Sequence, residues 1–130
     1  MTAPIPEILI AAAAAASDKK AVDIRVLDVS RHLMITDHFL ICSGNTERQV
    51  KTIAEEIDKR LGEHFRTRPF RREGEREARW VLLDYVDFVV HVFHHDEREY
   101  YDLERLWADV PSEKYEDPES TDEPAAAKAT

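Results

Sequence analysis

The sequence has few cysteines and no long hydrophobic run. Cys42 is the only cysteine among 130 residues, which excludes an internal disulfide and gives no sign of an oxidising compartment. No apolar stretch approaches the roughly 20 residues that a membrane-spanning helix needs. The first residues lack the basic region of a secretory signal and the arginines of a transit peptide. These absences predict a cytoplasmic protein that makes no membrane contact.

Basic residues are in the minority, because 18 Lys and Arg stand against 27 Asp and Glu and the net charge is −9. This negative net charge argues against a protein that binds nucleic acid through a broad basic face, and it favours a basic protein partner. Residues 109–130 hold seven acidic and two basic side chains and almost no apolar surface. We therefore predict a single domain over residues 1–108 and an acidic tail over residues 109–130, disordered from about Pro111.

Hydrophobic periodicity predicts the element order α-β-β-α-β-β-β-α. The expected helices cover residues 4–17, 46–65 and 96–107, and the expected strands cover residues 22–29, 38–42, 66–72, 80–85 and 88–93. Asn45 and Asp96 are the expected N-caps of the second and third helices. Pro69 cannot donate to a strand ladder, so the third strand should lie at a sheet edge or begin late. The fold class is α/β, with one mixed sheet and helices mainly on one face.

The chain is organised around residues 80–107, where two strands separated only by Val86 and Asp87 should pair antiparallel before the last helix. This segment is rich in aromatic residues, namely Trp80, Tyr85, Phe88, Phe93, Tyr100, Tyr101 and Trp107. Tyr100 and Tyr101 lie about 100° apart on a helix, so both can hardly point inward. We expect Leu103, Leu106 and Trp107 to mark its packed side. Because Trp and Tyr contribute strongly at interface centres, the segment predicts a protein-binding surface. A purely structural role for these rings stays open.

Three chemical alternatives to a protein-binding surface are phosphoryl transfer, a metal site and a cysteine nucleophile. Ser43-Gly44 precedes a helix, as in nucleotidyltransferases, where carboxylates on neighbouring strands hold divalent metal ions. The next strand carries arginines instead, and Asp84 and Asp87 lack a third partner. Strand alternation places His91 and His95 on one face and His94 on the other, so they predict no metal site. Cys42 falls within an apolar strand, which is typical of a small core residue.

A cluster of arginines could touch RNA phosphates. Its members are Arg60, Arg66, Arg68, Arg71, Arg72, Arg76 and Arg79. Interspersed glutamates offset much of this charge. A solvated sheet edge is the favoured interpretation, and a minor RNA contact stays open.

Two motifs resemble the ribosomal silencing factor family, also called the Iojap-related proteins. The first is ITDHFLICSGN over residues 35–45. The second comprises Trp80, Asp84-Tyr85, Asp87, Val90-His91-Val92-Phe93, Tyr100-Tyr101 and Leu103-Glu104-Arg105-Leu106-Trp107. The resemblance covers roughly residues 5–107. The family usually has Gly where this chain has Val86, and a β-branched residue is poorly tolerated at positive φ. We therefore expect a turn with negative φ or a reshaped turn.

The resemblance implies a nucleotidyltransferase-like fold without its catalytic motif, and a protein that is not an enzyme and needs no cofactor or metal. It also implies binding to the fourteenth universal protein of the large ribosomal subunit. Such binding would block joining of the small subunit and lower translation when nutrients are scarce, and a homodimer is implied for the free protein. The expected partner-binding residues are Trp80, Asp84, His91, Tyr100, Tyr101 and Glu104. Glu97, Glu99, Asp102 and Glu104 should form an acidic surface beside them.

Overall fold

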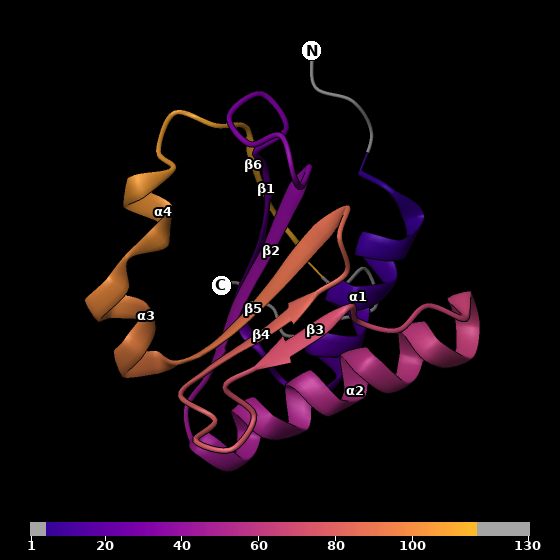
Figure 1. The fold of residues 1–130 in the computed structure, drawn as a ribbon. Helices are drawn as coiled ribbons and strands as arrows, with labels where there is room; N and C mark the ends of the chain where they lie inside the picture. Colours follow the sequence, from indigo (N-terminus) through magenta and orange to yellow (C-terminus); the bar gives the residue numbers. More distant parts are fainter. Residues whose placement is uncertain (1–4, 117–130) are drawn as a thin grey trace.

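A six-stranded mixed sheet forms the centre of the computed structural model, which describes residues 5–116 (Figure 1). The strand order is β3-β4-β5-β2-β1-β6. The strands are β1 (Val22–Asp28), β2 (His38–Gly44), β3 (Arg71–Glu73), β4 (Trp80–Asp84), β5 (Phe88–His94) and β6 (Ser112–Lys114). β2 and β5 run parallel, and the other neighbouring pairs run antiparallel. The α/β class with one mixed sheet is confirmed.

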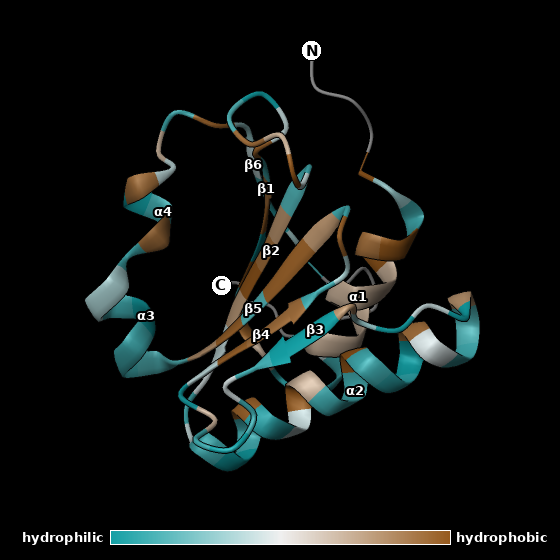
Figure 2. Ribbon diagram, viewed as in Figure 1, coloured by the Kyte–Doolittle hydropathy of each residue, from teal (hydrophilic) through white to brown (hydrophobic). Residues whose placement is uncertain are grey.

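Helices α1 (Glu7–Asp18) and α2 (Glu47–Phe65) cover one face of the sheet. Helical spacing places Val50, Ile53, Ile57 and Leu61 on one side of α2, and all four side chains are fully buried. Figure 2 shows hydrophobic residues on the strands that face these helices and polar residues along the outer side of α2. The alanines of α1 are small enough to let it pack closely on α2 and the sheet. No helix in the described part of the chain has the length and hydrophobicity to cross a membrane.

The opposite face of the sheet carries a second, smaller cluster of buried side chains. It consists of Leu27, Val29, Phe39, Ile41, Phe93 and Val110. The short helices α3 (His95–Tyr101) and α4 (Leu103–Leu106) lie beside this face (Figure 1). Because these two helices have no buried residue of their own, this face is covered less completely than the face under α1 and α2.

The β4–β5 hairpin is confirmed, with Trp80 opposite Phe93 and Asp84 opposite Val89. Of the two alternatives expected for this turn, a negative φ at Val86 is wrong, since its φ is 74°. The Asp87 amide donates to the Tyr85 carbonyl at 2.9 Å, which closes a three-residue γ-turn around Val86. The Asp84 carboxylate supports the turn by accepting from the Val86 amide at 2.8 Å.

The prediction of one helix over residues 96–107 is wrong. Asp102 adopts a left-handed conformation with φ 49°, which ends α3 and starts α4. This break turns α4 so that Leu103 and the following Trp107 pack against the second cluster, whereas Leu106 is 73% exposed rather than packed.

The predicted N-caps are also corrected. His94 caps α3 in place of Asp96, and Thr46 caps α2 in place of Asn45 because its hydroxyl accepts from the Gln49 amide.

The end of the described chain differs from the expected disordered tail. Residues 112–114 form β6, which pairs antiparallel with β1, and Tyr115 packs against the main core. Disorder from about Pro111 is therefore wrong for these residues, because hydrogen bonds to β1 and the buried Val110 hold them on the sheet. A separate acidic tail stays a prediction for residues 117–130, which lie outside the described residues. At the other edge, β3 begins after Pro69, as the proline predicted.

Candidate functional site

Aromatic rings from several elements touch one another in a continuous series across the second face of the sheet. We call this series the aromatic strip, and it runs through Tyr100, Tyr101, Trp80, His91, Phe39, Trp107 and His32. Neighbouring ring centroids lie 4.8 to 5.9 Å apart. These are the distances at which edge-to-face and tilted ring pairs attract one another. The strip therefore joins α3, three central strands and the β1–β2 loop into one surface.

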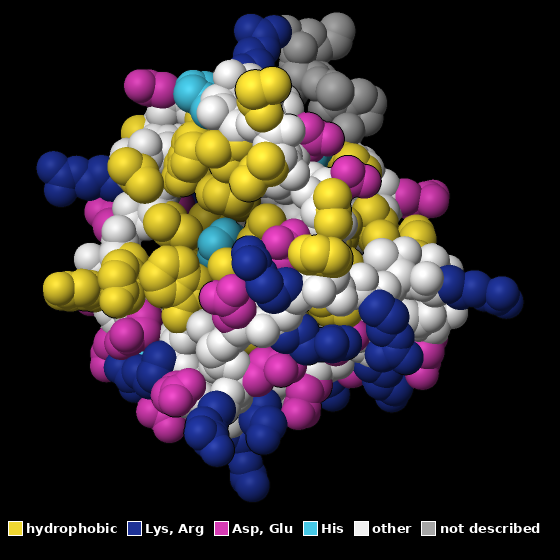
Figure 3. Space-filling model, in the orientation of Figure 1, with side chains coloured by type: hydrophobic (Ala, Val, Ile, Leu, Met, Phe, Trp, Pro, Cys, Tyr) yellow, Lys and Arg dark blue, Asp and Glu magenta, His cyan; other side chains and the backbone are white. Residues whose placement is uncertain are grey.

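The centre of the strip is buried, and exposure increases from there toward α3. Phe39 and His91 are buried, Trp80 is half-buried, and Tyr101 and Tyr100 are 48% and 81% exposed. Figure 3 shows hydrophobic side chains gathered over this part of the surface, from α3 and α4 across to the sheet. A folded monomer gains little from large rings in water, so the exposed end of the strip is a candidate contact for another macromolecule.

His91 lies beneath this surface rather than on it, because only 5% of it is exposed. Its Nδ1 accepts a hydrogen bond from the Trp80 indole Nε1 at 3.1 Å, which fixes the orientation of the indole. Burial lowers the pKa of His91 to about 4, so the ring is neutral at physiological pH and its proton sits on Nε2. The predicted contact role of His91 stays a prediction, while its observed contact is with Trp80.

Arg98 fixes α3 and α4 to the sheet, a role that sequence reasoning missed. Its side chain is only 10% exposed and pairs with Glu104 and with Asp23, the latter at 3.5 Å. Its Nη1 also donates to the Val22 carbonyl at 3.1 Å and to the Ser43 hydroxyl at 3.3 Å. The left-handed turn between the two helices brings Glu104 back to Arg98, and no regular helical spacing would have indicated that pair.

The expected acidic surface is smaller than the sequence suggested. Glu97 is paired with Arg79 at 2.7 Å, and Glu104 is paired with Arg98. Within residues 5–116, the one side chain paired with Glu99 is a histidine, His95, at 3.5 Å. The acidic character of α3 and α4 therefore depends on Glu99 and Asp102 more than on the other two carboxylates.

Asp84 is not brought to the aromatic strip. It lies at the opposite end of the five-residue β4 from Trp80, about 13 Å away at the usual rise of a strand. Its carboxylate accepts from the Val86 amide and approaches Arg71 at 3.5 Å. In this structure Asp84 supports the hairpin turn, and a contact with a partner stays a prediction.

The geometry around Ser43 gives the nucleotidyltransferase hypothesis little support. Ser43 is 3% exposed, and its hydroxyl is held between the Val22 carbonyl and Arg98. Within residues 5–116, no group of three or more His, Cys, Asp or Glu side chains is placed to hold a metal ion. Burial raises the pKa of the Cys42 thiol to about 12, so this thiol is not a poised nucleophile.

The arginine cluster is largely paired within the protein. Arg60 contacts Asp18 at 2.6 Å and Arg72 contacts Asp58 at 2.8 Å. Figure 3 shows basic and acidic side chains interspersed over the lower part of the same view, without a continuous basic face. This arrangement favours a solvated edge of the domain, and a minor ribosomal RNA contact stays a prediction.

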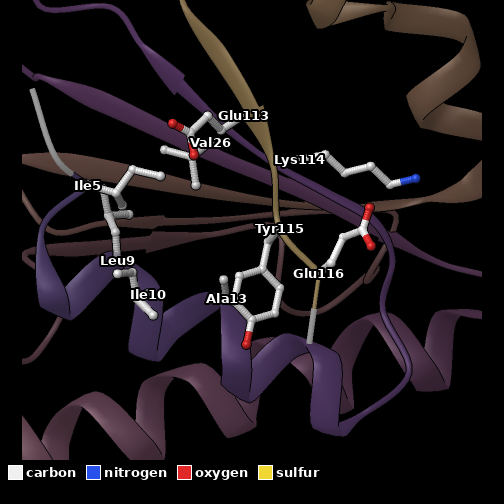
Figure 4. Close-up of a pocket in the computed structure, with 9 residues that line it drawn as sticks. All are labelled: Ile5, Leu9, Ile10, Ala13, Val26, Glu113, Lys114, Tyr115 and Glu116. Carbon is white, nitrogen blue, oxygen red and sulfur yellow. The ribbon is translucent and has the colours of Figure 1, made fainter. Parts of the chain in front are cut away.

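A groove of about 340 Å³ lies on the other side of the sheet, between α1 and β6 (Figure 4). Its wall is aliphatic on the α1 side, with Ile5, Leu9 and Ile10, while Tyr115 closes the β6 side. In Figure 4 the Lys114 side chain points away from these aliphatic groups. The charged residues Glu113, Lys114 and Glu116 complete the lining on the β6 side.

Comparison with known proteins gives consistent matches over most of the chain. Residues 2–130 match a family model described as "Ribosomal silencing factor during starvation". The chain is 52% identical over 104 residues to the ribosomal silencing factor RsfS of Bacillus subtilis, a match that covers 80% of this chain and 87% of that protein. A crystal structure of a protein from Chromobacterium violaceum is 34% identical, with a TM-score of 0.77, and the match covers 96% of this chain and 98% of that chain. A mouse protein named "Mitochondrial assembly of ribosomal large subunit protein 1" is 32% identical over 92 residues, covering 68% of this chain and 40% of that protein.

Proposed function

Since the chain belongs to the ribosomal silencing factor family, we propose that it binds the large ribosomal subunit in the cytoplasm and prevents the small subunit from joining. The proposed contact is the fourteenth universal protein of the large subunit, and the proposed result is lower translation when nutrients are scarce. The name of the mouse relative refers to assembly of the large ribosomal subunit, which supports that subunit as the target.

The observation that carries this proposal is the exposed end of the aromatic strip. Tyr100 and Tyr101 stand in water next to the half-buried Trp80, and Tyr101 lies 4.8 Å from the Trp80 ring. A partner that covers these rings gains their burial and loses little side-chain entropy, because Tyr101 and Trp80 are already packed together. Such preorganised aromatic residues are typical of interface hot spots.

Charge favours a basic partner over a nucleic acid. The carboxylates of Glu99 and Asp102 flank the exposed rings without an arginine partner among the described residues. Charges of this kind at an interface rim speed the encounter with a basic ribosomal protein more than they tighten the complex. The hydrophobic contact would supply most of the affinity.

A protein bound at the subunit contact surface would block subunit joining by its volume alone, without catalysing a reaction. An ordered body of this length has a radius of gyration of about 13 Å. A protein of that size on the face where the two subunits meet would keep them apart. The bacterial relatives are named as silencing factors, which are regulators, and not as enzymes.

Binding to purified large subunits tests the proposed surface. We expect Tyr101→Ala to weaken binding by at least about fivefold, the equivalent of 1 kcal/mol. Phe70→Ala is the matched control, because Phe70 is 78% exposed but lies at the Asp84 end of β4, away from Trp80, where its amide donates to the Asp84 carbonyl. Wild-type affinity of a folded Tyr101→Ala variant would show that the proposed surface is the wrong one.

Sedimentation of mixed subunits tests the proposed obstruction. Added protein should sediment with the large subunit and reduce the amount of joined ribosome, whereas the Tyr101→Ala variant should do neither. Stable binding that leaves subunit joining unchanged would refute the steric part of the proposal. The homodimer of the free protein stays a prediction, which analytical ultracentrifugation checks directly.

A further inference from the structure

The β1–β2 loop, residues 29–37, presents two large hydrophobic side chains to solvent. Met34 is 102% exposed and Ile35 is 82% exposed. Single exposed apolar residues are ordinary on a protein surface, but Met and Ile are among the residue types most often buried. Two of them side by side form an apolar patch that can contribute to a protein contact.

The loop is held in place by the aromatic strip itself. The His32 ring lies 5.9 Å from Trp107, and Leu33 packs against the cluster that contains Phe39. The amides of His32 and Leu33 both donate to the Val29 carbonyl at 2.9 Å. Met34 follows directly after these anchored residues, so its exposure results from a defined loop conformation.

The exposed rings near α3 are too few to make a complete interface. A stable protein–protein interface buries about 800 Å² on each partner and involves about 20–30 residues a side. Beyond Tyr100 the α3 surface is charged, with Glu99 and His95. In the other direction Leu106, 73% exposed, and then the loop continue the apolar surface.

We infer that Met34 and Ile35 form the second end of the docking surface, so that the partner covering Tyr100 and Tyr101 also covers the β1–β2 loop. This inference rests on the proposed function. The occupant is the same basic protein of the large subunit. The part of it that meets the loop is expected to be an apolar hollow, because the loop tip offers no charged side chain between Leu33 and Thr36. The central, buried rings of the strip support the contact from beneath.

Binding of the double variant Met34→Ser/Ile35→Ser to purified large subunits tests the inference. Both side chains are almost fully exposed, so we expect an unchanged Tm and a loss of affinity of about tenfold. The single variant Met34→Gln keeps the length of the side chain and should show part of the same loss. Phe70→Ser and Ile10→Ser are matched controls, since both residues are exposed, at 78% and 47%, and neither is on the strip. Both controls should bind like the wild type.

Three results would overturn the inference. The first is wild-type binding of the double variant while Tyr101→Ala binds weakly, which would leave the proposed function intact. The second is an equal loss in Phe70→Ser, which would show a general effect of surface hydrophobicity. The third is wild-type binding of both the double variant and Tyr101→Ala, and in that case the proposed surface fails as well.

Discussion

Replacing Val86 by glycine should stabilise the protein, although such a change in an exposed residue usually costs stability. Val86 is the central residue of the γ-turn between β4 and β5, with φ 74° and 53% of its surface exposed. A non-glycine residue in a sparsely populated backbone region costs about 1–3 kcal/mol. Glycine removes this strain because it has no Cβ.

Two losses oppose this gain. Glycine increases the entropy of the unfolded chain, which costs about 0.4–1 kcal/mol. Removal of a half-exposed valine side chain loses about 0.7 kcal/mol of burial, half of the value for a fully buried one. The middle of each range gives a net stabilisation of about 0.6 kcal/mol, or a rise in Tm of about 2–3 °C for a chain of this size.

Urea unfolding of the Val86→Gly variant measures this effect, with Val22→Gly as the control. Val22 is 43% exposed but has no positive φ, so its replacement relieves no strain and should destabilise the protein by about 1 kcal/mol. The free energies of unfolding of the two variants should therefore change in opposite directions. If Val86→Gly is destabilised as much as Val22→Gly, the turn at Val86 is not strained and the reasoning is wrong.

Three further changes have defined outcomes. Arg98→Met should lower the free energy of unfolding by about 1–3 kcal/mol, because Glu104 loses its ion-pair partner and Asp23 loses one of its two arginine partners, and urea unfolding measures the loss. Burial lowers the pKa of His91 to about 4, below the roughly 6.5 of an unfolded histidine. Between these two values the unfolded chain binds a proton that the folded protein does not, so the free energy of unfolding is highest above pH 6.5 and falls as the pH drops toward 4. The loss amounts to about 3 kcal/mol at pH 4, and His91→Gln should remove this slope in unfolding curves at pH 7 and 4.5. Deletion of residues 112–130 should lower Tm more than deletion of residues 117–130, because only the longer deletion removes β6 from β1; equal Tm values would show that β6 contributes nothing.

The spacing of hydrophobic residues and the positions of turn residues were sufficient to predict most of the helices and strands. The buried stripe of α2 follows from helical spacing, and the β4–β5 hairpin follows from two apolar runs separated by two residues. Pro69 placed its strand at an edge because proline has no amide hydrogen to donate. Each of these features depends on residues that are neighbours in the sequence.

Long-range contacts explain the features that were missed. Residues 112–114 are polar and predict no strand by themselves, and they form β6 because the edge of β1 offers backbone partners. Asp102 breaks the last helix because Glu104 meets Arg98 and Trp107 packs on Phe39. None of these contacts has a periodic signature in the sequence.

The sequence alone determined the fold class, the family resemblance and the presence of an aromatic segment, because periodicity, turn residues and composition are properties of neighbouring residues. Only the tertiary structure decided which of the candidate residues share a surface. It placed Trp80, Tyr100 and Tyr101 together, His91 beneath them and Asp84 at the other end of β4. The physical reason is that strand register and the left-handed turn at Asp102 set the distances between side chains, and both depend on packing across the whole sheet.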